Sequence, residues 1–113
     1  MTPDLSRPRA TPPYAILPAF SLTSEDLADG ERMGDRFTAI HENLSPGLRW
    51  SGAPAGTRSF VVSCFDPDAP SPSGWWHWTV VDLPASAAGL PRGAGESDDG
   101  LAAPAFHVRN DAG

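Results

Sequence analysis

Proline and glycine are the residues that most restrict what this chain can fold into. Its 113 residues include 13 prolines and 11 glycines. Proline inside a helix removes a backbone hydrogen-bond donor and clashes with the preceding turn, and both residue types favour turns. Long helices are therefore disfavoured, and the chain is expected to be all-β, with short strands joined by turns and irregular loops. Its length leaves room for one domain with a modest core.

Charge and hydropathy exclude several classes of partner. Eight basic residues against 14 acidic ones leave a formal charge of −6, and the sequence has no basic stretch. Because nucleic acids and anionic membranes attract clustered Lys and Arg, neither is predicted to bind. The N-terminal residues contain no apolar signal core, and no stretch approaches the roughly 20 apolar residues of a membrane span. A cytoplasmic location is the resulting expectation.

The chain is predicted to consist of a short leader and one domain. Residues 1–14 hold four prolines and two arginines with little to bury, which is typical of a flexible leader. Residues 15–113 are predicted to form a single β-domain. Within it, weak strand signals lie at 20–23, 37–40, 48–50 and 106–109, and the small, turn-rich residues 51–57 resemble a hairpin connection.

Two segments carry stronger strand signals. Residues 59–65 are nearly all apolar, β-branched or aromatic, which predicts a central strand buried on both faces. Cys64, the only cysteine, is expected there as a buried small hydrophobic residue. Residues 75–83 include three tryptophans that are expected to pack in the core. Strict alternation along this segment places Trp75, His77, Thr79 and Val81 on one face and Trp76, Trp78 and Val80 on the other.

The densest chemistry lies between these two segments, in Asp66-Pro67-Asp68-Ala69-Pro70. Pro67 disfavours helical angles at the preceding residue, so the carboxylates occupy a stiff, extended turn at a strand end. One interpretation is an acidic turn whose side chains cap their own backbone. The other is a site in which a carboxylate orients the imidazole of His77. His77 itself could instead be a core histidine bonded to a backbone carbonyl.

Catalysis and metal binding are weaker interpretations of the same residues. An Asp–His pair can orient a base, but a hydrolase also needs a nucleophile, and Ser63, Ser71 and Ser73 lack a nucleophile-elbow context. The three histidines show no zinc-ligand spacing, so no metal site and no cofactor are predicted. His41, His107 and the acidic run 96–99 are expected to be solvated.

Several motifs in register over residues 43–95 resemble one known family. The motifs are Leu44-Ser45-Pro46-Gly47-Leu48-Arg49-Trp50, Pro54-Ala55-Gly56-Thr57-Arg58-Ser59-Phe60, Asp66-Pro67-Asp68-Ala69-Pro70, Gly74-Trp75-Trp76-His77-Trp78 and Asp82-Leu83-Pro84-Ala85. Together they resemble the phosphatidylethanolamine-binding protein (PEBP) family, in particular its bacterial Raf kinase inhibitor-like branch, also called YbhB/YbcL.

The resemblance implies a fold and a site. The fold is antiparallel, with two packed sheets and Greek-key connections, and a small pocket at one end accepts phosphate-like groups. Matching the family motifs residue by residue implies that Asp66 and His77 line this pocket and that Ala69, Pro70 and Trp75 form its wall. Asp68 is predicted to brace the loop.

The resemblance also implies a difference and a function. Family members continue after the segment matching 110–113 with a Gly- and Pro-rich loop, a His-Arg-Tyr motif and commonly a terminal helix, so the fold is expected to be incomplete and to expose apolar edges. The predicted function is non-enzymatic binding of a small phospho-compound or other anion. The alternatives are an inhibitor module acting on a kinase or protease partner and a hydrolase using Asp66 and His77.

Overall fold

The computed structural model describes residues 17–113, and the predicted leader at 1–14 lies outside the described residues. Within 17–113 the regular structure is six strands and three short 3₁₀ turns. The strands are β1 (Ser21–Thr23), β2 (Leu48–Ser51), β3 (Ser59–Asp66), β4 (Trp75–Pro84), β5 (Gly89–Leu90) and β6 (Phe106–His107), and the turns are η2 (Asp35–Phe37), η3 (Ala94–Glu96) and η4 (Asp98–Gly100). No helix in this range is long and apolar enough to cross a membrane.

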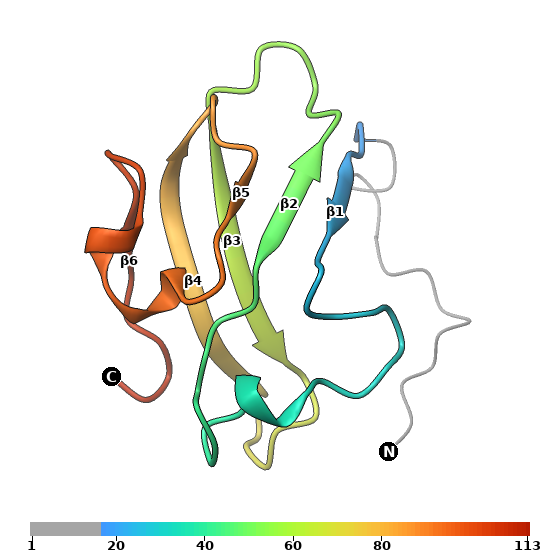
Figure 1. Cartoon of the computed structure of the whole chain (residues 1–113), viewed down its shortest axis with the longest axis vertical. Helices are drawn as coiled ribbons and strands as arrows, with labels where there is room; N and C mark the ends of the chain where they lie inside the picture. The colour runs from blue at the N-terminus through green and yellow to red at the C-terminus, as the bar shows by residue number, and fades with distance from the viewer. Residues whose placement is uncertain (1–16) are drawn as a thin grey trace.

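The strands form two antiparallel sheets that face each other (Figure 1). One sheet has the order β1-β2-β5 and the other the order β3-β4-β6. The buried core lies between them, since it contains Trp50 and Leu90 from the first sheet and Phe60, Val80 and Leu83 from the second. The prediction of an all-β fold with two packed antiparallel sheets is confirmed.

Trp50 shows why β2 takes its place in the core. Its side chain is 7% exposed and its ring lies 5.4 Å from that of Phe60 in the opposite sheet. Buried indole N–H groups usually find a partner, and here Trp50 Nε1 donates to the Ala87 carbonyl at 2.9 Å. The expected core role holds for this tryptophan.

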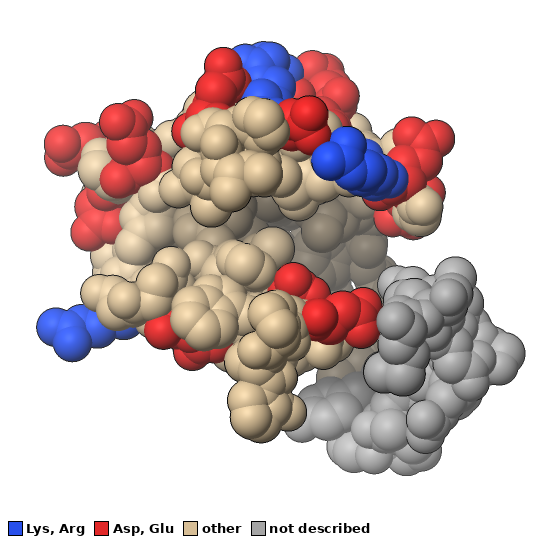
Figure 2. Space-filling view, turned by 90° about the horizontal axis from the view of Figure 1, so that it is seen from below, with Lys and Arg blue, Asp and Glu red and all other residues tan. Residues whose placement is uncertain are grey.

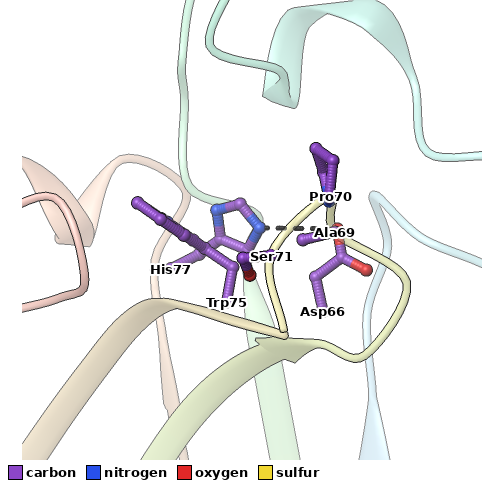
Figure 3. A pocket seen from close by; sticks show the side chains of 6 residues that line it. All are labelled: Asp66, Ala69, Pro70, Ser71, Trp75 and His77. Carbon is purple, nitrogen blue, oxygen red and sulfur yellow. Dashed lines mark ion pairs between the residues drawn. The ribbon is translucent and has the colours of Figure 1, made fainter. Parts of the chain in front are cut away.

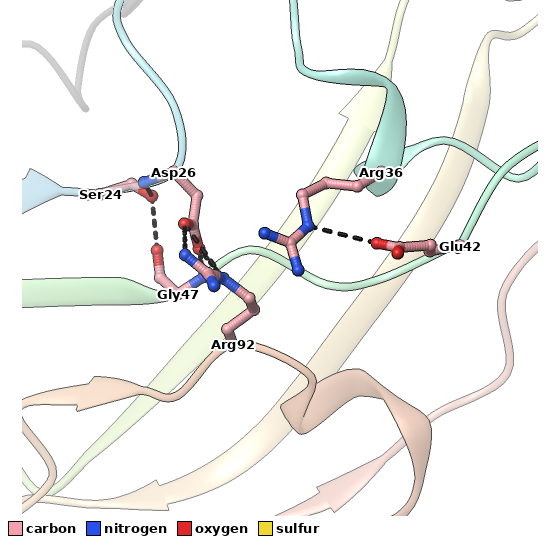
Figure 4. Close-up of polar contacts among 6 residues, drawn as sticks. All are labelled: Ser24, Asp26, Arg36, Glu42, Gly47 and Arg92. Carbon is pink, nitrogen blue, oxygen red and sulfur yellow. Dashed lines mark hydrogen bonds and ion pairs between the residues drawn. The ribbon is translucent and has the colours of Figure 1, made fainter.

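A polar network fixes the loops at one end of the first sheet (Figure 4). Asp26 follows β1, and its side chain is only 4% exposed. It accepts hydrogen bonds from the Gly47 N–H at 2.7 Å and from the Arg92 Nε at 3.1 Å. These contacts hold together the segments that follow β1, precede β2 and follow β5, which are far apart in the sequence.

Two of the predicted local structures are wrong. Residues 37–40 do not form a strand, because η2 ends at Phe37 and the Thr38 hydroxyl donates to the Asp35 carbonyl at 2.7 Å. Such side-chain bonds to nearby backbone compete with strand pairing. Residues 51–57 are not a hairpin connection, because β2 and β3 belong to different sheets and this loop crosses between them.

The strand β3 is not buried on both faces. It is an edge strand of its sheet, whereas β4 is the central strand. Phe60 is 9% exposed but Val61 is 64% exposed, so burial alternates along the strand. Phe65 is 42% exposed, and Cys64 is only half-buried. The apolar run at 59–65 therefore predicted the strand correctly, but the predicted central position in the sheet is wrong.

The predicted division of β4 between two faces is also wrong. The pairing of β3 with β4 shifts register between Phe60 and Val62 and again between Cys64 and Phe65, and β4 carries the extra residue each time. At the second shift Phe65 pairs with Trp76 but Cys64 pairs with Trp78, so His77 has no partner on β3. Because directly paired residues share a face, Trp75 lies on the same face as Trp78 and Val80, while Trp76 faces outward against Phe65.

Candidate functional site

The candidate site lies where the β3–β4 hairpin turns. Asp66 is the last residue of β3 and pairs directly with Trp75, the first residue of β4. The connecting residues 67–74 contain three prolines. The loop is held by its own bonds, since the Ser71 N–H donates to the Ala69 carbonyl at 2.7 Å and the Gly74 N–H donates to the Ser71 carbonyl at 3.3 Å. A stiff loop on a paired strand end gives Asp66 a defined position.

A recess of about 310 Å³ opens between this loop and the start of β4 (Figure 3). Its lining residues, which we call the recess residues, are Asp66, Ala69, Pro70, Ser71, Trp75 and His77. The five residues that the sequence assigns to a ligand site are all among them, and Asp68 is not. The structure therefore brings the predicted pocket residues together.

Asp66 and His77 point toward one another across the recess. His77 Nε2 lies 3.7 Å from Asp66 Oδ2, and the two side chains are 51% and 44% exposed. This separation is too long for a direct hydrogen bond, so each group keeps capacity for a third partner between them. His77 is half-exposed and therefore not a core histidine, and it lies on the same side of the sheet as Asp66.

A hydrogen bond between Asp66 and Asp68 braces the loop. Asp66 Oδ1 accepts from the Asp68 backbone N–H at 3.0 Å. Asp68 therefore contributes its backbone, and the bracing carboxylate is that of Asp66, in agreement with the alternative of an acidic turn capping its own backbone. The capping role is compatible with a place in the recess, because Oδ1 fixes the loop while Oδ2 faces His77 at 3.7 Å.

Ser71 lines the recess although the sequence does not assign it to the ligand site. Its hydroxyl donates to the Gly74 carbonyl rather than to His77. The signal that could have identified it is its place in a proline-rich loop on a rigid hairpin, where binding residues concentrate. Pattern alone does not distinguish it from Ser73, its neighbour in the same loop.

The other two histidines lie outside the recess. His41 Nε2 lies 3.9 Å from Asp35 Oδ2, and both side chains are about half exposed, as expected for a solvated pair. His107 is not solvated, which corrects the prediction. Its side chain is 19% exposed, its Nδ1 lies 2.8 Å from Asp98 Oδ1, and its ring stacks on Trp78. The acidic run 96–99 is thus partly a structural anchor.

Burial and charge near the recess act on Cys64. Burial, and then the Asp66 carboxylate, raise the pKa of the Cys64 thiol above its usual value. A raised pKa leaves little thiolate at neutral pH, so Cys64 is a poor nucleophile. The prediction that Cys64 is buried is only partly met, because its side chain is half-buried.

The face that bears the recess is predominantly acidic at its margin (Figure 2). Uncharged side chains form the hollowed middle of this face, and acidic side chains gather around it with few basic ones among them. The formal charge of the whole chain is −6. Long-range attraction of an anion is therefore weak here, and any anion must be held by short-range hydrogen bonds.

Comparison with known proteins agrees with the resemblance in the sequence. The family model described as phosphatidylethanolamine-binding protein matches residues 23–113. The YbcL protein of Escherichia coli (strain K12) is 46% identical over 101 residues, which are 84% of this chain and 55% of YbcL. The YbhB protein of the same strain is 53% identical over 79 residues, which are 66% of this chain and 50% of YbhB.

Solved structures give the same answer. The crystal structure of E. coli YbcL, described as a new member of the mammalian PEBP family, matches with a TM-score of 0.76 over 83% of this chain and 61% of that one. A PEBP homologue from Chlamydia trachomatis matches with a TM-score of 0.70 at 27% identity, over 84% of this chain and 60% of that one. The chain spans about half the length of the curated relatives that it matches. It belongs to the phosphatidylethanolamine-binding protein family, in the branch that contains YbhB and YbcL.

Proposed function

We propose that this chain binds a small phosphate-containing compound, or another small anion, in the recess and makes or breaks no covalent bond. The observation that carries the proposal is the convergence of His77 and Asp66 at 3.7 Å inside a recess whose other walls are largely apolar. An apolar recess with a few converging polar groups is the usual form of a small-ligand site.

The two side chains offer complementary hydrogen bonds. An imidazole N–H of His77 can donate to a phosphoryl oxygen, and Asp66 Oδ2 can only accept while it is ionised. A fully ionised phosphate would be repelled by Asp66, by about 1 kcal/mol per unit charge at 4 Å in bulk water and by about 4 kcal/mol at an effective dielectric constant of 20. A protonated phosphate oxygen offsets this repulsion, because its hydroxyl donates a hydrogen bond to the carboxylate.

A zwitterionic head group fits the same recess in a second way. Its phosphate would accept from His77, while its ammonium group would lie near the Asp66 carboxylate and the Trp75 ring. The family description, phosphatidylethanolamine-binding protein, supports a ligand with both charges. Comparing the binding of phosphate and of phosphoethanolamine therefore distinguishes a phosphate ligand from a zwitterionic head group.

The recess also supports binding rather than hydrolysis. Its one hydroxyl among the described residues, that of Ser71, donates to the Gly74 carbonyl and is not held by His77. The nearest thiol, Cys64, has a raised pKa. Covalent hydrolysis requires a nucleophile activated by a neighbouring base, and neither Ser71 nor Cys64 is placed to act as one.

The test is a titration followed by NMR of the histidine side chains. Inorganic phosphate and phosphoethanolamine at millimolar concentration are expected to shift the His77 imidazole signals. His41 is the matched internal control, because it is another half-exposed histidine near an aspartate, at 3.9 Å. An unmoved His77, or equal shifts of His77 and His41, would refute binding in the recess. Phosphoester turnover that is lost in Asp66→Asn would refute the absence of catalysis.

A further inference from the structure

The start of β4 lacks part of its backbone pairing beside the recess. His77 is the extra residue at a β-bulge, and it has no partner on β3. A bulged residue leaves the ladder locally disrupted, so its backbone groups need other partners. On the opposite edge of β4, β6 pairs only with Val80 and Val81 and does not reach His77.

The C-terminal turn at 110–113 supplies partners for the backbone of Trp76 and His77, through two side chains and one backbone N–H. Asn110 Nδ2 donates to the His77 carbonyl at 3.0 Å. Asp111 bonds Trp76 twice: its N–H donates to the Trp76 carbonyl at 3.1 Å, and its Oδ2 accepts from the Trp76 N–H at 2.7 Å. The two residues therefore continue the sheet edge past the end of β6, where no strand is present among the described residues.

The turn is itself held in shape. Asn110 Oδ1 accepts from the Ala112 N–H at 3.0 Å, and the Asn110 carbonyl accepts from the Gly113 N–H at 3.1 Å. The Asn110 amide is thus used at both ends, as donor to His77 and as acceptor within the turn. An aspartate at this position would keep the acceptor and lose the donor, so the amide is specifically required.

We propose that Asn110 and Asp111 are positioning residues for His77, which fix the backbone of the bulge so that the imidazole faces Asp66 across the recess. The inference rests on the proposed function only for its effect on ligand affinity. Its structural part, the orientation of His77, can be tested in the free protein. Neither residue lines the recess, so neither is expected to touch the ligand.

Three substitutions separate the individual bonds. Asp111→Ala removes the acceptor for the Trp76 N–H, whereas Asp111→Asn keeps an oxygen that can accept the same bond. Asn110→Asp removes the donor to His77 and puts a negative charge in its place. Asp29→Ala serves as the control, since Asp29 is an exposed turn residue elsewhere in the fold.

The readouts are the His77 imidazole signals of the free protein, the apparent phosphate affinity measured from them, and the urea midpoint. Asp111→Ala and Asn110→Asp are expected to shift the free His77 signals and to weaken phosphate binding roughly three- to tenfold, the value of about one net hydrogen bond. Asp111→Asn should restore most of both, and Asp29→Ala should change neither. If Asp111→Ala no longer unfolds cooperatively in urea, Asn110→Asp carries the test, because it leaves both Asp111 bonds to Trp76 in place.

Two results would overturn the inference. One is an unchanged His77 spectrum in both Asp111→Ala and Asn110→Asp. The other is a spectral change in Asp111→Asn as large as that in Asp111→Ala. If wild-type His77 does not respond to phosphate but its free signals move in these variants, the proposed function fails and the positioning role stands.

Discussion

Gly74 connects the shape of the recess to the stability of the fold. It is the last residue of the β3–β4 loop and has a φ of +75°, a backbone conformation that residues other than glycine rarely adopt. A Cβ atom at this position would lie 2.8 Å from the Asp66 carbonyl oxygen and 2.6 Å from the Phe65 ring. Gly74→Ala should therefore both strain the backbone and displace the residue that carries the recess carboxylate.

A matched glycine separates the two effects. Gly56 has a φ of +86° and nothing within 4 Å of a built Cβ, so Gly56→Ala meets only the backbone cost, about 1–2 kcal/mol. Gly74→Ala meets the same cost and adds the overlap with Asp66, which as overpacking amounts to about 1–3 kcal/mol. The Phe65 ring is 42% exposed and can move aside, but the Asp66 carbonyl is held in the β3–β4 pairing.

Urea unfolding measures the stability part of this prediction, and the phosphate-dependent His77 shift measures the recess part. Gly74→Ala should be the less stable variant by about 1–3 kcal/mol, and only this variant should bind phosphate more weakly. Equal losses of stability in the two variants would show that the close approach of Gly74 to Asp66 does not exist. Unchanged phosphate affinity in a destabilised Gly74→Ala would show that the position of Asp66 does not matter for binding.

Three further predictions concern other parts of the fold. The hydrogen bonds from Arg92 and then from the Gly47 N–H lower the pKa of Asp26 to about 2 from 3.8. Because the pKa of Asp26 is lower in the folded state, the ionised carboxylate stabilises the fold above pH 3.8, and this contribution is lost as the pH falls toward 2. In urea unfolding from pH 5 to pH 2, the wild type should therefore lose stability more steeply than Asp26→Asn. Parallel curves for the two proteins would contradict this. Cys64, whose pKa is raised by burial, should react with a thiol reagent at pH 8 several-fold more slowly than after unfolding in urea, and equal rates would contradict its burial. The edge strand β3 has no charge before Asp66 and exposes Val61 at 64%, so the chain should self-associate with rising concentration in sedimentation velocity, and Val61→Lys should reduce this; a wild type that remains monomeric at every concentration would refute it.

The strands could be predicted because their signals are local. Residues 59–65 and 75–83 coincide closely with β3 and β4, since β-branched and aromatic runs bounded by proline and glycine favour strands. The place of β3 at a sheet edge could not be predicted, because it depends on which strands pair. The pairing of β2 with β1 and β5, rather than with β3, is likewise set by contacts distant in sequence.

The chain's own pattern points to Asp66 and His77, because one hairpin supplies both. Ala69, Pro70 and Trp75 are assigned only through the family resemblance, and Ser71 is not assigned at all. Asp66 and Trp75 are joined by one short loop, so residues near in sequence meet in space. The supporting contacts come from much further away. Asn110 is 33 residues from His77, and Arg92 is 66 residues from Asp26. Hydrogen bonds at such separations carry no periodic signal, and only the fold reveals them.

The bulge at His77 explains how the recess can be both open and well supported. Alternation correctly places Trp75 and His77 on one face, but it assigns Trp78 to the other. The extra residue in β4 returns Trp78 to the recess side, where it packs against the buried core. Without the bulge, the residue after His77 would face outward beside Trp76. A one-residue irregularity thus puts the imidazole next to a side chain anchored in the core. A positioned imidazole would lose less freedom on binding a ligand, so the bulge is compatible with the proposed function.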